Sequence, residues 1–211
     1  MIPKDGLLGV GLNFNERLIT DPDVLVAKVA AYRSMGGKNV VVTQGSYDLI
    51  HVGRMRYLHK GWEQGDFLIV LLDSDEKVRS RKGKDRPVTN EQERAEILCH
   101  LRWVNVVFLK PIDDERHKYV KLVKPDVLIV SESTGDRKYT EEKVKELKQL
   151  CTVDGRVVVL PPQAEDSTSA RVRRFILEGA EHFKESVLGR LNILLPKVFE
   201  ESMNDIHKKK D

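Results

Sequence analysis

The residues best suited to chemistry lie in one short segment that follows the apolar run Val40-Val41-Val42-Thr43. It reads Gly45-Ser46-Tyr47-Asp48-Leu49-Ile50-His51-Val52-Gly53-Arg54 and leads into a helical pattern. The first N–H groups of a helix have no partner within the helix, and the helix dipole favours an anion there. A glycine lets the backbone approach such an anion closely. The segment therefore predicts a phosphate-binding turn and indicates nucleotide chemistry.

Two side chains at the start of this helix could act on a phosphoryl group. His51 can donate a hydrogen bond to a phosphoryl oxygen as negative charge moves during transfer; its simpler interpretation is a polar residue that caps the helix. Arg54 follows one turn later on the same face and is a permanent cation able to grip phosphate. Its simpler interpretation is a surface arginine paired with an acid.

A basic segment, Arg79-Ser80-Arg81-Lys82-Gly83-Lys84-Asp85-Arg86-Pro87, follows the next apolar run. Residues 79–86 are predicted to form a loop. Dense cations beside a glycine suit a mobile clamp on a triphosphate, whereas most charge runs are solvated surface. Its place after a strand favours the clamp, because ligands of parallel sheets bind beyond the carboxyl ends of the strands.

A second Ser/Thr-rich and basic segment lies at Asp166-Ser167-Thr168-Ser169-Ala170-Arg171-Val172-Arg173-Arg174. Hydroxyls, free N–H groups and cations at a helix start could form a second phosphate site. Judged on its residues alone, an ordinary helix cap with a basic exposed face is the better interpretation. Arg94 likewise reads, on its own, as a helix-surface residue paired with an acid.

The elements that must position these residues alternate between apolar strands and helices. Thr20-Asp21-Pro22 predicts a helix start. That helix is expected to bury Val24, Ala27, Ala31 and Met35 and to end at Gly36-Gly37. Thr89 is expected to cap a later helix, with Gln92 at capping-box spacing. Strands are predicted near residues 39–43, 67–72, 104–109, 127–130 and 157–160, and further helices near 52–64, 113–123, 141–150 and from 167 onward.

This order predicts an α/β fold with a parallel five-stranded sheet covered on both faces. Residues 1–19 are expected to be an irregular N-terminal segment, residues 20–178 the main domain, and residues 179–211 a C-terminal helical extension. One face of the extension carries Phe183, Val187, Leu191, Leu194 and Val198, with Pro196 between them. We expect this face to pack on its own domain or on a second copy of the chain.

Composition excludes several classes of protein. Hydrophobic residues make up 40% of the chain and charged residues 33%, and no apolar run is long enough for a membrane span. The chain has only Cys99 and Cys151, which predicts reduced thiols and a cytoplasmic location. The net charge of +3 is too small to indicate nucleic-acid binding, and few aromatic residues lie near the basic ones to act as stacking platforms.

The motif resembles the signature G-x-[FY]-D-x-x-H-x-G-H of the nucleotidylyltransferase (cytidylyltransferase-like) superfamily. The chain is most similar to its sugar-phosphate and polyol-phosphate branch, which includes heptose-1-phosphate adenylyltransferase and glycerol-3-phosphate cytidylyltransferase. The resemblance runs from about residue 20 to 178. Its further motifs are Gly65-Asp66-Phe67-Leu68-Ile69-Val70, Asp73-Ser74-Asp75, Lys82-Gly83, Arg86-Pro87-Val88, Glu93-Arg94, Lys124-Pro125-Asp126, Gly135-Asp136 and Ser167-Thr168-Ser169.

The resemblance implies a Rossmann-like doubly wound sheet and an NTP substrate with Mg²⁺. A phosphorylated small-molecule acceptor would attack the α-phosphate and release pyrophosphate. Catalytic roles are expected of His51, Arg54 and Lys82. Nucleotide binding is expected of Gly45, Ser46, Tyr47, Asp48, Gly53, Arg94, Ser167, Thr168 and Ser169. Acceptor binding is expected of Arg79 and Arg86, no residue is assigned to a metal site, and a homodimer is expected because family members often pair.

The chain departs from the family pattern at three places. Arg54 stands where the family has its second signature histidine, and Asp166 stands where an apolar residue is usual. The loop Pro161-Pro162-Gln163-Ala164-Glu165 lacks the arginine of the cytidylyl branch, which slightly favours ATP over CTP. The segment Ser131–Arg137 differs from the heptose enzymes, so the acceptor stays open. Two hypotheses follow: an active nucleotidylyltransferase, or a catalytically silent homologue that binds nucleotide as a sensor or scaffold.

Overall fold

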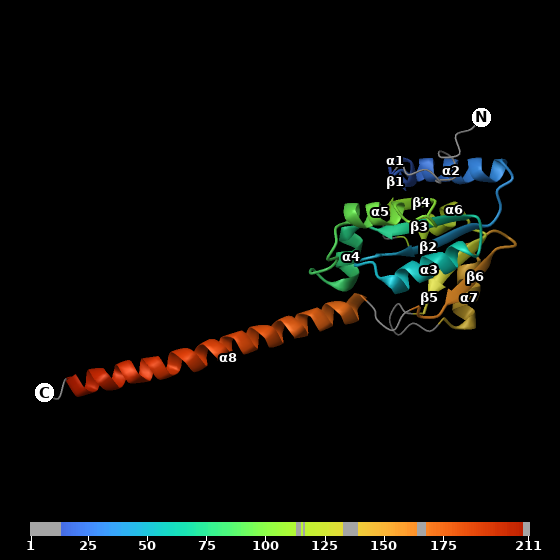
Figure 1. The fold of residues 1–211 in the computed structure, drawn as a ribbon. Coiled ribbons are helices and arrows are strands. Elements are labelled where there is room, and N and C mark those ends of the chain that lie inside the picture. The colour runs from blue at the N-terminus through green and yellow to red at the C-terminus, as the bar shows by residue number, and fades with distance from the viewer. Residues whose placement is uncertain (1–13, 113–114, 116, 133–138, 164–167, 209–211) are drawn as a thin grey trace. The chain divides into compact units, whose positions relative to one another are not determined.

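The structure, a computed structural model, describes residues 14–112, 115, 117–132, 139–163 and 168–208. The chain divides into two compact units, residues 1–165 and residues 166–211. Figure 1 shows the elements of both units. The predicted boundary between residues 178 and 179 lies inside the long helix of the second unit.

The first unit is built on a parallel sheet of six strands in the order β1-β4-β3-β2-β5-β6. The α/β Rossmann-like class is therefore confirmed, with one strand more than the five expected. The added strand, β1, has two residues that pair Leu18 with Val107 and Ile19 with Phe108. Two residues are too few to show a strand period, so the segment was expected to be irregular. The strands are β1 (Leu18–Ile19), β2 (Val40–Gly45), β3 (Phe67–Asp73), β4 (Val106–Lys110), β5 (Val127–Ser131) and β6 (Arg156–Leu160).

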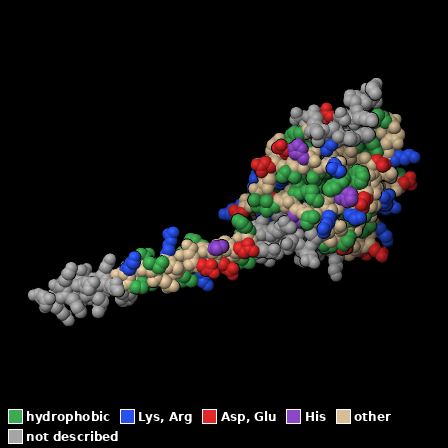
Figure 2. Space-filling view, viewed as in Figure 1, with side chains coloured by type: hydrophobic (Ala, Val, Ile, Leu, Met, Phe, Trp, Pro, Cys, Tyr) green, Lys and Arg blue, Asp and Glu red, His purple; other side chains and the backbone are tan. Residues whose placement is uncertain are grey.

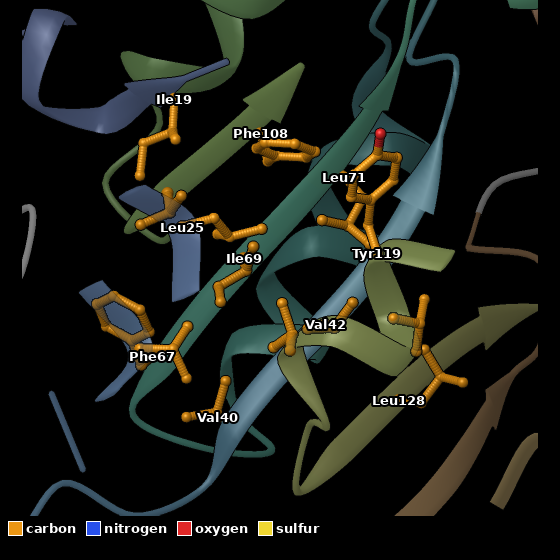
Figure 3. Packing of buried hydrophobic residues seen from close by; sticks show 14 of the residues in the cluster. Ile19, Leu25, Val40, Val42, Phe67, Ile69, Leu71, Phe108, Tyr119 and Leu128 are labelled. Carbon is orange, nitrogen blue, oxygen red and sulfur yellow. The ribbon is translucent and has the colours of Figure 1, made fainter. Parts of the chain in front are cut away.

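Helices cover both faces of this sheet (Figure 1). Successive residues of the central strand β3 point to opposite faces, so Phe67, Ile69 and Leu71 belong to one core and Leu68 and Val70 to the other. Figure 3 shows the first of these cores. The helices are α1 (Phe14–Arg17), α2 (Pro22–Ser34), α3 (Val52–Trp62), α4 (Asp75–Lys82), α5 (Glu91–Cys99), α6 (Lys118–Val123), α7 (Glu141–Lys148) and α8 (Thr168–Lys208).

Helix α2 begins and ends as predicted but buries a different face. The Asp21 side chain accepts a hydrogen bond from the Asp23 N–H at 2.8 Å, which caps the helix start. The buried residues are Leu25, Val29 and Tyr32, whereas Val24 is 49% exposed and Met35 50%. Both sets have helical spacing, and the stacking of Tyr32 on Phe67, with ring centroids 4.5 Å apart, lies on the buried one.

Two local predictions around the basic segment were wrong. Arg79 to Lys82 belong to helix α4 rather than to a loop. This helix has Asp75 and Glu76 in its first turn and cations in its last, which the helix dipole favours. Asn90 rather than Thr89 caps α5, because its side chain accepts from the Glu93 N–H at 2.9 Å.

The second unit consists mainly of α8, a helix of 41 residues that continues through Pro196. Its hydrophobic side chains at the described positions are exposed, among them Phe183, Val187, Leu191 and Leu194. Figure 2 shows hydrophobic side chains at its surface. Within the described part of the chain, no helix has the length and apolarity needed to cross a membrane.

Candidate active site

The predicted strand–turn–helix lies at the carboxyl end of the central strand β2. Gly45 ends the strand, and the turn leads to His51, the residue before the first turn of α3. Tyr47 and Leu49 have positive φ values of 47° and 48°. Non-glycine residues rarely adopt this backbone conformation, and where they do the surroundings must hold them in it. The polar contacts around the turn provide that support.

Asp48 fastens the turn to the segment between α4 and α5. Its buried carboxylate accepts hydrogen bonds from Arg86 Nε at 2.8 Å and from the Val88 and Thr89 N–H groups, each at 3.1 Å. Several N–H groups that donate to one carboxylate fix its orientation. Arg86, expected to bind the acceptor, is therefore engaged with Asp48 in this structure, and its expected contact with the acceptor stays a prediction.

Arg94 supports the same turn from below. Its side chain is 1% exposed. It donates to the Ser46 carbonyl, to the Thr89 carbonyl at 2.9 Å and to Asp75 Oδ1 at 2.7 Å. The Nε, Nη1 and Nη2 atoms of Arg94 thus each have a protein partner. The structure gives Arg94 a positioning role, and its expected direct contact with nucleotide stays a prediction.

Lys82, the last residue of α4, also contacts the turn. Its Nζ donates a hydrogen bond to Ser46 Oγ at 2.7 Å. Partial burial lowers the pKa of Lys82 from its ordinary value, and the neighbouring charges of Arg86, Arg81 and Arg54 lower it further. Cations that disfavour one another's charge form a place where an anion is stabilising.

The carboxylates near this cluster do not neutralise all of it. Among the described residues, salt bridges join Asp48 to Arg86, and Asp73 to Arg81. In that part of the chain, no salt bridge joins a carboxylate to Arg54 or Lys82. Two cations therefore face the turn with positive charge to offer to a ligand.

His51 occupies the cap position of α3 without acting as a side-chain cap. Its backbone is extended, and its imidazole makes no hydrogen bond to the N–H groups of the helix start. The simpler interpretation of His51 as a capping residue is therefore wrong. Gly53 is buried in the first turn of the same helix, and Arg54 beside it is half-buried.

A buried polar network anchors the turn to the sheet. Tyr57 of α3 and Tyr47 of the turn both hydrogen-bond the Thr43 hydroxyl, at 2.8 and 3.3 Å, and the Tyr57 hydroxyl lies 3.2 Å from the Ile129 carbonyl. Burial raises the pKa of Tyr47 to about 12, so its hydroxyl stays protonated and can donate at neutral pH. The network ties the turn, β2, α3 and β5 together.

A buried ion pair, which the sequence analysis missed, lies beside the site. Asp73 and Lys110 end β3 and β4 and are register partners, with Lys110 Nζ 2.5 Å from the Asp73 carboxylate and Arg81 at 3.1 Å. Burial opposes ionisation of Asp73, but these cations outweigh it and hold its pKa below the usual value. The signal in the sequence was opposite charges that end two apolar runs.

Four of the expected residues are not among the contacts described above. Ser167 lies outside the described residues, and Thr168 and Ser169 begin α8 in the second unit. Arg79 is exposed on α4. The roles expected of these four residues stay predictions.

The comparison with family models covers the whole of this arrangement. A model described as "Cytidylyltransferase-like" matches residues 42–175, more than half of the chain. The chain belongs to the cytidylyltransferase-like family. The match begins within β2 and includes the turn, α4 and α5, which carry the contacts described above.

Curated relatives agree with this family assignment. The "Bifunctional protein HldE" of Citrifermentans bemidjiense is 36% identical over 154 residues, which are 71% of this chain and 31% of that protein. The protein of the same name from Geotalea uraniireducens is 39% identical over 139 residues, 66% of this chain and 27% of that protein. The chain thus spans less than a third of the length of these relatives. A solved structure, the lipopolysaccharide core biosynthesis protein from Thermoplasma volcanium GSS1, has 23% identity and a TM-score of 0.49 over 62% of this chain and 100% of that one.

Proposed function

We propose that this cytidylyltransferase-like protein transfers a nucleoside monophosphate from an NTP to a sugar phosphate or polyol phosphate, with release of pyrophosphate. The observation that carries the proposal is the cation cluster at the turn. Lys82 is bonded to Ser46, Arg54 lies in the first turn of α3, and neither has a carboxylate partner among the described residues. This arrangement suits a polyphosphate at a helix N-terminus.

The reaction needs positioning more than it needs a base. The second pKa of a phosphate monoester is about 6, so the acceptor is already largely dianionic at neutral pH. One acceptor oxygen bonds to the α-phosphorus while the bond from that phosphorus to the bridging oxygen breaks, and the electron pair leaves with pyrophosphate. We assign His51 to a hydrogen bond with a phosphoryl oxygen, and Lys82 and Arg54 to the charge that builds up during transfer.

We assign Mg²⁺ to the substrate rather than to a cage of protein ligands. The cations Lys82 and Arg54 lie at the turn and suit a phosphate ligand rather than a metal ion. Mg²⁺ is commonly held by substrate phosphates and water with one or two carboxylates. It would enter with the triphosphate and neutralise part of its charge.

We further propose that ATP is slightly preferred over the other nucleotides and that the acceptor is a phosphorylated small molecule. The proposed location is the cytoplasm. A role of the loop after β6 in binding the nucleobase is supported by its contact with α3, where Arg56 donates a hydrogen bond to the Gln163 carbonyl at 3.5 Å. Pyrophosphate release should be measured with ATP, CTP, GTP and UTP against a panel of sugar and polyol phosphates. A signal that requires one nucleotide and one acceptor supports the transferase and names both substrates.

The second candidate is a silent homologue that binds nucleotide without turnover, and Arg54 at the signature histidine position is the observation that favours it. Arg54→His separates the two, with Arg102→His, at an exposed arginine outside the turn, as the matched control. For an active enzyme that uses Arg54, we expect a loss of about 10- to 100-fold in kcat/KM. A sharp gain in activity, or nucleotide binding by calorimetry with no pyrophosphate from any pair, would favour the silent homologue instead.

A further inference from the structure

Helix α8 carries an apolar stripe with a regular repeat. Its described members are Ile176, Ala180, Phe183, Val187, Leu191 and Leu194, all of which are exposed. The spacings between them are 4, 3, 4, 4 and 3, and Ile176, Ala180, Phe183 and Val187 are each followed eleven positions later by another apolar residue. Eleven residues in three turns is close to the natural period of an α-helix. The stripe therefore runs nearly straight along the helix.

The exposed apolar stripe of α8 is expected to pack against a partner. A long helix in water owes most of its stability to an apolar face that packs against something, and Pro196 removes a hydrogen bond inside α8. The six stripe residues span 18 positions, a length of roughly 27 Å at 1.5 Å per residue. Such a stripe fits another helix better than a single pocket.

The order of the stripe is symmetric about Val187. Leu191 and Phe183 lie four positions to either side, and Leu194 and Ala180 lie seven positions to either side. An antiparallel copy of the same helix, related by a twofold axis at Val187, would therefore place the stripe residues from Ala180 to Leu194 opposite one another and Ile176 opposite Val198. This is the self-complementarity that an isologous twofold interface requires.

The charges of α8 favour the same direction. The sequence near its start carries Arg171, Arg173 and Arg174, and the sequence near its end carries Glu200, Glu201 and Asp205. Antiparallel pairing about Val187 brings Arg173 and Arg174 of one helix opposite Glu201 and Glu200 of the other. Parallel pairing would bring each of these groups opposite its own like charges. We infer that α8 pairs with α8 of a second copy of this chain, antiparallel and centred on Val187.

Disulfide formation in the full-length chain tests this pairing. Cys151 is changed to Ser, since it is partly exposed, while Cys99 is buried and can stay. In that background, Val187→Cys, Ala180→Cys and Leu194→Cys are made singly and oxidised with glutathione disulfide. Antiparallel pairing predicts cross-linked dimers from Val187→Cys alone, and from Ala180→Cys with Leu194→Cys only when the two proteins are mixed.

Sedimentation of the unmodified chain and of Leu191→Glu completes the test. We expect a dimer mass for the former and a monomer mass for the latter. The helical signal by circular dichroism should be weaker in the monomer, because α8 has lost the partner that stabilises it. A monomer mass for the unmodified chain would overturn the pairing. So would a dimer that cross-links equally well at all three positions, which means parallel helices, or a dimer that Val187→Cys does not cross-link, which means an interface elsewhere.

Discussion

Lys82 makes a single described hydrogen bond, which goes to Ser46 Oγ. Removal of the Lys82 ammonium group should therefore disturb ligand binding more than folding. For Lys82→Met we expect a loss of about 100-fold or more in kcat/KM, the scale seen when one charge-stabilising contact is removed. Pyrophosphate release and a thermal melt measure the two effects. Lys84→Met, an exposed lysine two residues away, should leave both unchanged.

The pH dependence of activity should report the same lysine. Only the protonated form of Lys82 attracts a triphosphate, and its pKa is lowered from 10.5 by burial and by the neighbouring arginines. As the pH rises through this lowered pKa the charge is lost, so kcat/KM should fall on an alkaline limb below pH 10.5. Arginine stays protonated at any such pH, so Lys82→Arg should shift the limb upward. An unmoved limb would assign it to another group.

At the scale of elements, the ends of β3 and β4 depend on one buried ion pair. Asp73→Asn would leave Lys110 buried without its anion, and loss of one partner of a buried pair costs about 3–5 kcal/mol. Asp73→Asn with Lys110→Met removes both charges and should recover most of that stability. Urea unfolding measures both. Equal losses in the single and double variants would mean that the pair contributes packing rather than charge.

The same scale shows why some expectations held and others did not. Strands β2 to β6 were predictable because each is an apolar run, whereas the two-residue β1 was not. The turn was predictable because glycine, acid and histidine stand in a spacing that suits phosphate. The buried face of α2 was not, since two stripes had the same period and only the contact between Tyr32 and Phe67 distinguishes them. Local spacing carries no information on a partner from another strand.

The long-range pairings of the arginines were hidden from the sequence for the same reason. Arg94 reads as a surface residue on a polar helix, yet it joins Ser46, 48 positions away. Arg86 reads as part of a cation run, yet it pairs with Asp48, 38 positions away. Both pairings can be seen only in the folded structure. The sequence therefore predicted which segments meet at the site, but not which of their side chains bond to one another and stabilise it.

At the scale of the whole molecule, the two units carry different kinds of stability. The first has two buried cores, one on each face of its sheet. The second is a helix whose described hydrophobic residues are exposed. Because α8 has an apolar face to cover, association through α8 would link its stability to protein concentration, as mass action requires.

The position of β1 at the edge of the sheet has a consequence for how the chain folds during synthesis. Leu18 pairs with Val107, and Arg17 donates to the carbonyl of Cys99, 82 residues further on, at 2.8 Å. At a translation rate of about 5–20 residues per second, the partners of this strand emerge roughly 4–18 s after it. The strand therefore stays unpaired until β4 emerges, while β2 and β3 can already pair, so during synthesis β1 should dock after β2 and β3 have paired. Hydrogen exchange on nascent chains still bound to the ribosome should protect the β2 and β3 amides before those of residues 18 and 19.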